Sequence, residues 1–153
     1  MPYRPHVPVT APQPKGFLQI ASIPDSLLVA HQQIASGLTT DVVAELASQL
    51  AWEPSVICRI VGIERTTFQR RAKKPEATSR VLNSEQSAKI YSFTKVMEAA
   101  IALFEGDVDK AKGWLQKPAR ALGHHCPIDM LSTPAGVEAV LDLIGQIEHG
   151  IVI

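Results

Sequence analysis

Two adjacent histidines and a cysteine, His124, His125 and Cys126, stand between a glycine and a proline in the stretch ALGHHCPIDML. Imidazole and thiolate groups are zinc ligands, and a histidine close to a cysteine can activate the thiol as a nucleophile. A third interpretation is a rigid turn that carries polar side chains. The choice among these alternatives separates an enzyme or a metalloprotein from a binding protein.

The spacing of these residues argues against a metal site and against catalysis. Structural zinc sites draw nitrogen and sulfur ligands from separate, closely spaced pairs, whereas contiguous side chains in one turn do not easily converge on one ion. The other histidines, His6, His31 and His149, form no second pair with ligand spacing. A Cys/His nucleophile also needs an orienting acid and an oxyanion hole, and no motif marks either. We therefore expect a protein that is not an enzyme and that holds no metal or other cofactor.

A basic stretch, ERTTFQRRAKK at residues 64–74, has side chains suited to nucleic acid. It follows a short apolar segment that ends at Gly62, and glycine permits a sharp turn between two helices. This arrangement is typical of a helix-turn-helix unit, whose second helix enters the DNA major groove. We expect Ile63, Phe68 and Ala72 to face the protein. The side chains of Arg and Gln pair with base edges, and those of Thr and Lys suit phosphates, so the expected DNA contacts are Arg65, Thr66, Thr67, Gln69, Arg70, Arg71, Lys73 and Lys74.

Two residues of this stretch depart from the usual helix-turn-helix pattern. Glu64 stands where a small capping residue is more common, and its carboxylate would repel phosphate. Arg71 occupies a position that is often apolar. The alternative interpretation is a solvated basic face on an ordinary helical hairpin.

The charges of the chain are unevenly distributed. The sequence has 153 residues, with 15 basic and 15 acidic side chains and a net charge of zero. Residues 59–97 hold nine basic and three acidic side chains, whereas residues 98–153 hold four and eight. A basic middle block suits phosphates, and an acidic C-terminal third suits a different, protein surface. This segregation indicates two tasks on one chain.

The composition is that of a globular protein, with 46% hydrophobic and 20% charged residues. Two cysteines are too few for a disulfide framework. The sequence has neither an apolar leader segment nor an uncharged run long enough to span a bilayer. We therefore expect a cytoplasmic protein that does not enter a membrane.

The elements that position these residues are all predicted to be helices. Apolar side chains recur at three- and four-residue steps over residues 24–37, 39–52, 53–62, 64–74, 107–116 and 133–150. The longest helix is predicted over residues 84–106, with an apolar stripe of Ile90, Phe93, Val96, Met97, Ala100, Ile101 and Phe104. The predicted fold class is all-α. Its expected parts are a Pro-rich extended tail at 1–16, a helix-turn-helix domain at 17–82, and a long helix with a small helical domain at 83–153.

The C-terminal stretch WLQKPARALGHHCPIDMLSTPAGVEAVLDLIGQIEHG, residues 114–150, resembles the toxin-binding domain of Xre/MbcA/ParS-type antitoxins. The family pattern is a Trp-Leu pair, a proline, Leu-Gly, a variable pair, Pro-(Leu/Ile)-(Asp/Glu), a Thr or Ser, and a closing helix. The variable pair falls on His124 and His125, which favours the rigid-turn interpretation. A weaker resemblance extends upstream to about Thr40. The motif residues are Trp114, Leu115, Pro118, Leu122, Gly123, Pro127, Ile128, Asp129, Leu131, Thr133, Gly136, Val140, Leu143, Ile147 and Gly150.

These motif residues are expected to support the binding surface rather than to form it. Trp114 and Leu115 supply a buried anchor, and the prolines preset turns and helix starts. Asp129 is expected to cap or accept hydrogen bonds from backbone N–H groups of the loop. Asp107 is predicted to be the N-cap of the helix over residues 107–116, and Thr133 that of the last helix.

The resemblance implies an antitoxin of a type II toxin–antitoxin pair. The implied partner is a RES-domain toxin that consumes NAD, neutralised by burial of its active site. The implied chain also binds operator DNA as a homodimer, represses its own transcription and forms a higher-order hetero-oligomer with the toxin. The alternative is a stand-alone helix-turn-helix regulator whose C-terminal domain serves only for dimerisation.

The sequence ends in three β-branched residues after a predicted helix. Such an ending is either a frayed terminus or a segment that enters a pocket of a partner. In this family the C-terminal region faces the toxin. The residues expected to contact the toxin are Glu148, His149, Gly150, Ile151, Val152 and Ile153.

Overall fold

The computed structural model describes residues 26–150, and the regular structure of this part is helical, apart from two isolated β-bridges. The predicted all-α fold class is confirmed. The predicted tail at residues 1–16 lies outside the described residues. Within residues 26–150, no helix combines the length and the apolar character that crossing a membrane requires. The α-helices are α2 (Leu27–Ser36), α3 (Thr40–Leu50), α4 (Pro54–Val61), α5 (Arg65–Ala72), α6 (Ser84–Leu103), α7 (Val108–Leu115) and α8 (Pro134–Glu148).

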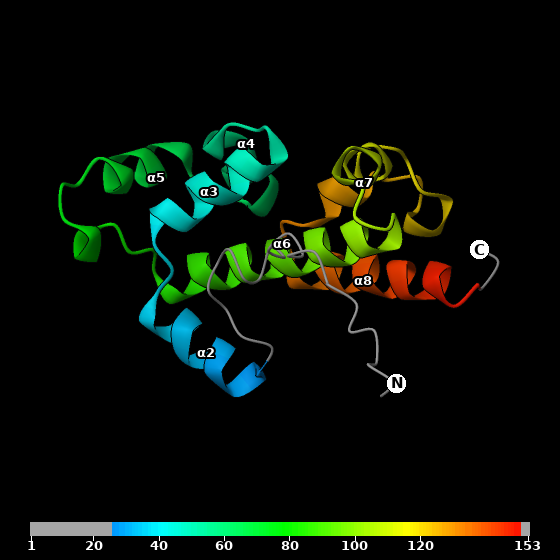
Figure 1. Ribbon diagram of the computed structural model, residues 1–153, viewed down its shortest axis with the longest axis horizontal. Coiled ribbons are helices and arrows are strands. Elements are labelled where there is room, and N and C mark those ends of the chain that lie inside the picture. Colours follow the sequence, from blue (N-terminus) through cyan, green and yellow to red (C-terminus); the bar gives the residue numbers. More distant parts are fainter. Residues whose placement is uncertain (1–25, 151–153) are drawn as a thin grey trace, which may run out of the picture.

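Helix α6 is the central element around which the others are arranged (Figure 1). Helices α3, α4 and α5 lie together near its N-terminal half, and α2 packs against it from another side. Helix α7 lies near its C-terminal half, and α8 runs alongside it. Short 3-10 segments complete the connections, namely η1 (Ala77–Ser79), η2 (Arg120–Leu122) and η3 (Pro127–Met130).

Side-chain caps determine where several helices begin. Asn83 and Gln86 form a reciprocal capping box at the start of α6, with N–O distances of 2.7 and 3.1 Å. The predicted caps Asp107 and Thr133 are confirmed, because each side chain accepts a backbone N–H at 3.0 Å. Thr39 stands at the N-cap position of α3, but its side chain makes no capping hydrogen bond. The first turns of α6, α7 and α8 are therefore specified locally.

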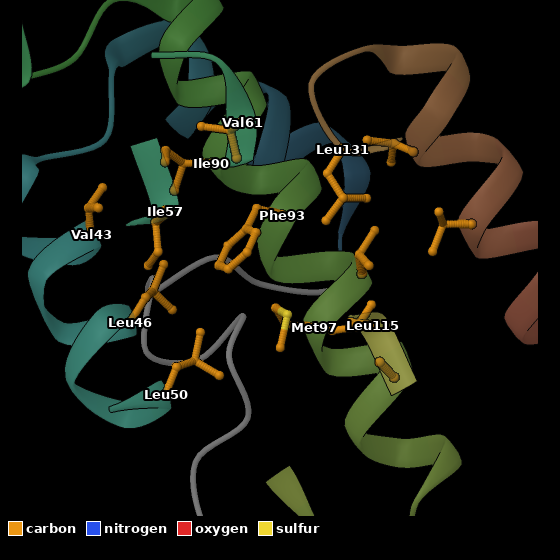
Figure 2. Close-up of a cluster of buried hydrophobic side chains, with 14 of the residues drawn as sticks. Val43, Leu46, Leu50, Ile57, Val61, Ile90, Phe93, Met97, Leu115 and Leu131 are labelled. Carbon is orange, nitrogen blue, oxygen red and sulfur yellow. The ribbon is translucent and has the colours of Figure 1, made fainter. Parts of the chain in front are cut away.

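The apolar stripe predicted on the long helix forms the centre of the core. Ile90, Phe93, Val96, Met97 and Ala100 are fully buried, and Ile101 and Phe104 are partly buried. Figure 2 shows the Phe93 ring between side chains of α3 and α4 on one side and those of the C-terminal half on the other. One cluster of buried residues runs from Ala30 to Ile144. The core therefore continues across the predicted domain boundary between residues 82 and 83.

The two cysteines have different environments, and this leads to a prediction about alkaline pH. Burial raises the pKa of the Cys58 thiol from 9.0 to about 11. Between these values the folded protein retains a proton that the unfolded chain has lost, so the stability falls as the pH rises. We expect this loss in urea titrations that compare about pH 8, below both pKa values, with about pH 10, which lies between them.

The control for this prediction is Cys58→Ala, which removes the contribution of the thiol to the pH dependence of stability. The free energy of unfolding of the Ala variant should fall less steeply with pH than that of the unchanged protein. Equal slopes would show that Cys58 does not titrate differently in the folded and unfolded states. Cys126 is partly exposed, so it should react with a thiol reagent in the folded protein, whereas Cys58 should react only on unfolding.

Candidate functional site

Helices α4 and α5 are joined by a short turn that determines how α5 is presented. Gly62 ends α4 in the left-handed conformation at φ +79°, which a glycine adopts without steric cost. The Ile63 N–H then donates to the Cys58 carbonyl at 2.8 Å. Ile63 and Phe68 are each 5% exposed, as predicted, and they attach α5 to the core. The rest of α5 is free to face outward.

The prediction that Ala72 faces the protein is wrong. Ala72 is exposed, whereas Arg71 is partly buried and its Nη1 donates to the Val81 carbonyl. The reason is that α5 contacts the core through Phe68 alone, so its last turn is oriented by the returning chain and not by an apolar residue. Arg71 thus has a structural contact that the sequence pattern did not indicate.

The remaining residues expected to contact DNA lie mostly on the outer face of α5. Arg65, Thr66, Gln69 and Arg70 are exposed, as are Lys73 and Lys74 just beyond the helix. Thr67 is partly buried and its hydroxyl donates to Glu64 at 3.5 Å.

The exposed cations of α5 are not neutralised by acidic neighbours in the described part of the chain. The ion pairs found there join Arg80 to Asp41 at 3.1 Å and Lys89 to Glu85 at 3.9 Å. None of these four residues lies on α5. The positive charge on the outer face of α5 is therefore available to an anionic partner.

Arg80 holds the segment after α5 in place. Its Nη1 donates to the carbonyls of Lys74 and Pro75 at 2.9 and 3.1 Å. Its Nε and Nη2 form a bidentate pair with Asp41 of α3 at 3.2 and 3.1 Å. Arg80 therefore connects the chain just beyond the C-terminal end of α5 to α3.

Two lysines from the C-terminal half of the molecule bind helix ends in the N-terminal half. The ammonium group of Lys89 in α6 donates to the Gly62 carbonyl at 3.3 Å. The ammonium group of Lys112 in α7 donates to the Leu50 carbonyl at 2.5 Å. Lys112 also lies 5.2 Å from the centre of the Trp52 ring. The C-terminal end of a helix carries partial negative charge, which favours a cation there. These contacts connect α3 and α4 to the helices that carry the C-terminal motif.

The C-terminal motif residues divide between core and surface. Leu115 is fully buried, Pro127 is buried, and the partly buried Trp114 ring lies 6.5 Å from that of Phe104. Pro118 and Gly123 are exposed, and Gly123 has φ +62°. The expected anchor role of Trp114 and Leu115 agrees with this packing.

Asp129 does not cap the loop as predicted. It is exposed, and η3 has no side-chain capping hydrogen bond. Asp129 lies on η3 where this segment borders a cleft of about 540 Å³. Trp52, Arg59 and Gln116 also line this cleft. The carboxylate therefore contributes charge to the cleft instead of closing a turn.

The His-His-Cys stretch forms a compact turn. The backbones of Ala119 and His125 form a β-bridge, with the Ala119 N–H donating to the His125 carbonyl at 3.0 Å. His124 has φ +65°, and both histidine side chains are exposed. The Cys126 thiol donates to the Gln116 carbonyl at 3.2 Å. This backbone agrees with the rigid-turn interpretation.

The end of α8 borders an apolar groove that sequence reasoning missed. Glu148, His149 and Gly150 are exposed, whereas the expected contact residues 151–153 lie outside the described residues. The groove has a volume of about 410 Å³ and includes Arg120 at its edge. The available signal was the Leu143–Ile147 pair, which is apolar at a four-residue spacing near the end of the helix. The lining residues are Trp114, Ala119, Arg120, Ala121, Leu143, Ile147 and Gly150.

Comparison with known proteins identifies the family. The protein family described as "Antitoxin Xre/MbcA/ParS C-terminal toxin-binding domain" matches residues 99–150 of this chain. A protein of Yersinia enterocolitica named Antitoxin Xre is 33% identical over 150 residues, which cover 97% of this chain and 98% of that protein. The chain belongs to the Xre antitoxin family. The resemblance seen in the sequence is thereby confirmed.

Two further relatives carry the same name. The Antitoxin Xre of Photorhabdus laumondii is 38% identical over 117 residues, which cover 76% of each chain. That of Pseudomonas putida is 25% identical over 120 residues, covering 78% of this chain and 71% of the relative. The family match begins in the last turns of α6 and ends just beyond α8. It therefore contains the C-terminal motif and the groove beside the end of α8.

Proposed function

We propose that this Xre-family antitoxin neutralises a cognate toxin by direct binding at the end of α8. The observation that carries the proposal is the exposed end of α8 beside an apolar groove, inside the segment matched by a toxin-binding domain family. Ile147 is 37% exposed there, and Arg120 adds a positive charge. An apolar groove with a charged edge is typical of a protein-binding surface.

The proposed toxin is a RES-domain enzyme that degrades NAD, and the proposed inhibition is occlusion of its active site. The residues placed at this contact are Glu148, His149 and Gly150, followed in the chain by Ile151, Val152 and Ile153. The antitoxin contributes no catalytic group, and the pair acts in the cytoplasm.

The second part of the proposal is operator binding and autorepression by a homodimer. The exposed cations of α5 support it, because they are presented on a helix that follows a tight turn and whose C-terminal end is held by hydrogen bonds of Arg71 and Arg80. Paired recognition helices on a dimer supply more base contacts than one short helix. The proposed DNA-binding residues are those predicted from the sequence, with Arg71 expected to contribute mainly through its contact with Val81.

Co-expression with the adjacent open reading frame tests the antitoxin function. We expect the neighbouring protein alone to arrest growth, and the full chain to restore growth and to co-purify with it. Deletion of residues 150–153 should reduce rescue, because it removes the segment proposed to enter the active site. The matched control is Glu138→Ala, an exposed residue near the other end of α8 that should leave rescue unchanged.

The outcomes distinguish toxin neutralisation as a whole from the specific role of the last residues. A harmless neighbour that does not co-purify would argue against neutralisation and favour a stand-alone regulator. Full rescue by the shortened chain would exclude the last residues as the inhibitory segment, while leaving the groove as the binding surface.

A further inference from the structure

A second groove lies between α4 and the first turn of α5. It has a volume of about 360 Å³ and is lined by Ser55, Val56, Arg59, Ile63 and Arg65. Arg59 lies in the last turn of α4, and Arg65 is the first residue of α5. Both arginines are exposed, whereas Ile63 is buried. The groove thus combines an apolar part with two cationic side chains from successive helices.

The electrostatics of this groove favour an anion. Both guanidinium groups are charged at any physiological pH, and neither takes part in the ion pairs found within residues 26–150. Two like charges that border one groove repel each other, and an anion bound between them would remove this repulsion. The apolar side chains Val56 and Ile63 offer a surface for a group without charge.

Arg59 borders both this groove and the cleft beside Asp129, and the two differ in charge. On the other side it borders the cleft that contains the Asp129 carboxylate, which disfavours a second anion there. The groove shared with Arg65 has no carboxylate among its lining residues. An anion is therefore expected on the Arg65 side.

We propose that the groove between Arg59 and Arg65 binds the sugar-phosphate backbone of DNA, next to the major groove that α5 enters. The inference rests on the proposed operator binding and adds Arg59 and Ser55 of α4 to it. The guanidinium groups bind a phosphate through paired N–H donors, the Ser55 hydroxyl donates to a phosphate oxygen, and Val56 contacts the deoxyribose. DNA is the occupant because Arg65 of the groove also belongs to α5, which carries the exposed Arg70 and is followed in the chain by the exposed Lys73 and Lys74.

The test measures binding of the full chain to two DNA duplexes of equal length by fluorescence anisotropy. One duplex carries the region upstream of the gene, and the other has an unrelated sequence. Arg59→Gln should weaken binding to both by about five- to tenfold near 0.1 M salt, and should make the salt dependence shallower by about one unit. Arg59→Lys should restore most of the salt dependence, because it keeps the charge.

The matched control is Lys117→Gln, which removes one exposed positive charge in the other half of the molecule. It should leave both affinities unchanged, and all variants should keep the melting temperature of the unchanged chain. An unchanged salt dependence for Arg59→Gln, or an equal loss for Lys117→Gln, would overturn the inference. So would a loss confined to the upstream duplex, because that result indicates base reading.

Failure of the inference is distinguishable from failure of the proposed function. If the unchanged chain binds both duplexes and Arg59→Gln binds equally well, only the groove assignment is wrong. If the unchanged chain binds neither duplex even at low salt, the operator-binding part of the proposed function is wrong as well.

Discussion

Gly136→Ala is expected to destabilise the protein by about 3 kcal/mol or more, because the added methyl group has no space. A Cβ at this position would lie 1.8 Å from the Met130 carbonyl oxygen and 2.8 Å from its carbon. Both atoms belong to the backbone of η3, so no side-chain rotation relieves the clash. The displacement would also break the cap between the Gly136 N–H and Thr133 at 3.0 Å. Urea denaturation measures the loss of stability, and co-purification measures the loss of toxin binding.

The control is Gly145→Ala in the same helix, where a Cβ would meet no atom within 4 Å. Alanine has a higher helix propensity than glycine, so this variant should be more stable by about 0.5–1 kcal/mol. Equal stability of the two variants would contradict the close approach of α8 to η3.

Phe93→Ala is expected to cost about 3–5 kcal/mol and to destabilise both halves of the molecule together. Phe93 is fully buried, and it lies between side chains of the N-terminal helices and those of the C-terminal half (Figure 2). Removal of the ring leaves a cavity that both groups line. The measurement is a denaturation curve followed separately through Trp52 and Trp114 in single-tryptophan backgrounds. The two curves should coincide and move together to lower urea.

The control for this prediction is Ala102→Gly on the exposed face of α6. It should cost only about 1 kcal/mol, the difference in helix propensity between the two residues. Separate transitions of the two tryptophans would instead support two independent domains that meet near residue 82.

The helical elements could be predicted from the sequence because their signals are local. The periodic apolar stripe of α6 and the caps Asp107 and Thr133 depend on residues a few positions apart. The C-terminal motif is also visible in the linear sequence, so the family can be recognised without knowledge of any tertiary contact.

The details of the candidate sites could not be predicted in the same way, because they depend on which helix ends meet. Arg71 was expected on the DNA-binding face, but its donation to Val81 arises only where the chain returns after α5. Asp129 was expected to cap its own loop, yet the packing of η3 turns it towards the cleft beside Trp52 and Arg59.

By itself, the sequence determined the all-α class, most helix starts, the apolar stripe of α6 and the antitoxin family. Only the tertiary structure decided that Arg59 and Arg65 border one groove and that Lys112 reaches α3. It also decided that the apolar groove beside Ile147 opens at the end of α8. The physical reason is the range of the interactions: helix periodicity and caps act over a few residues. Grooves and interhelical hydrogen bonds, in contrast, arise from side chains that are distant in sequence and are brought together by the shared core.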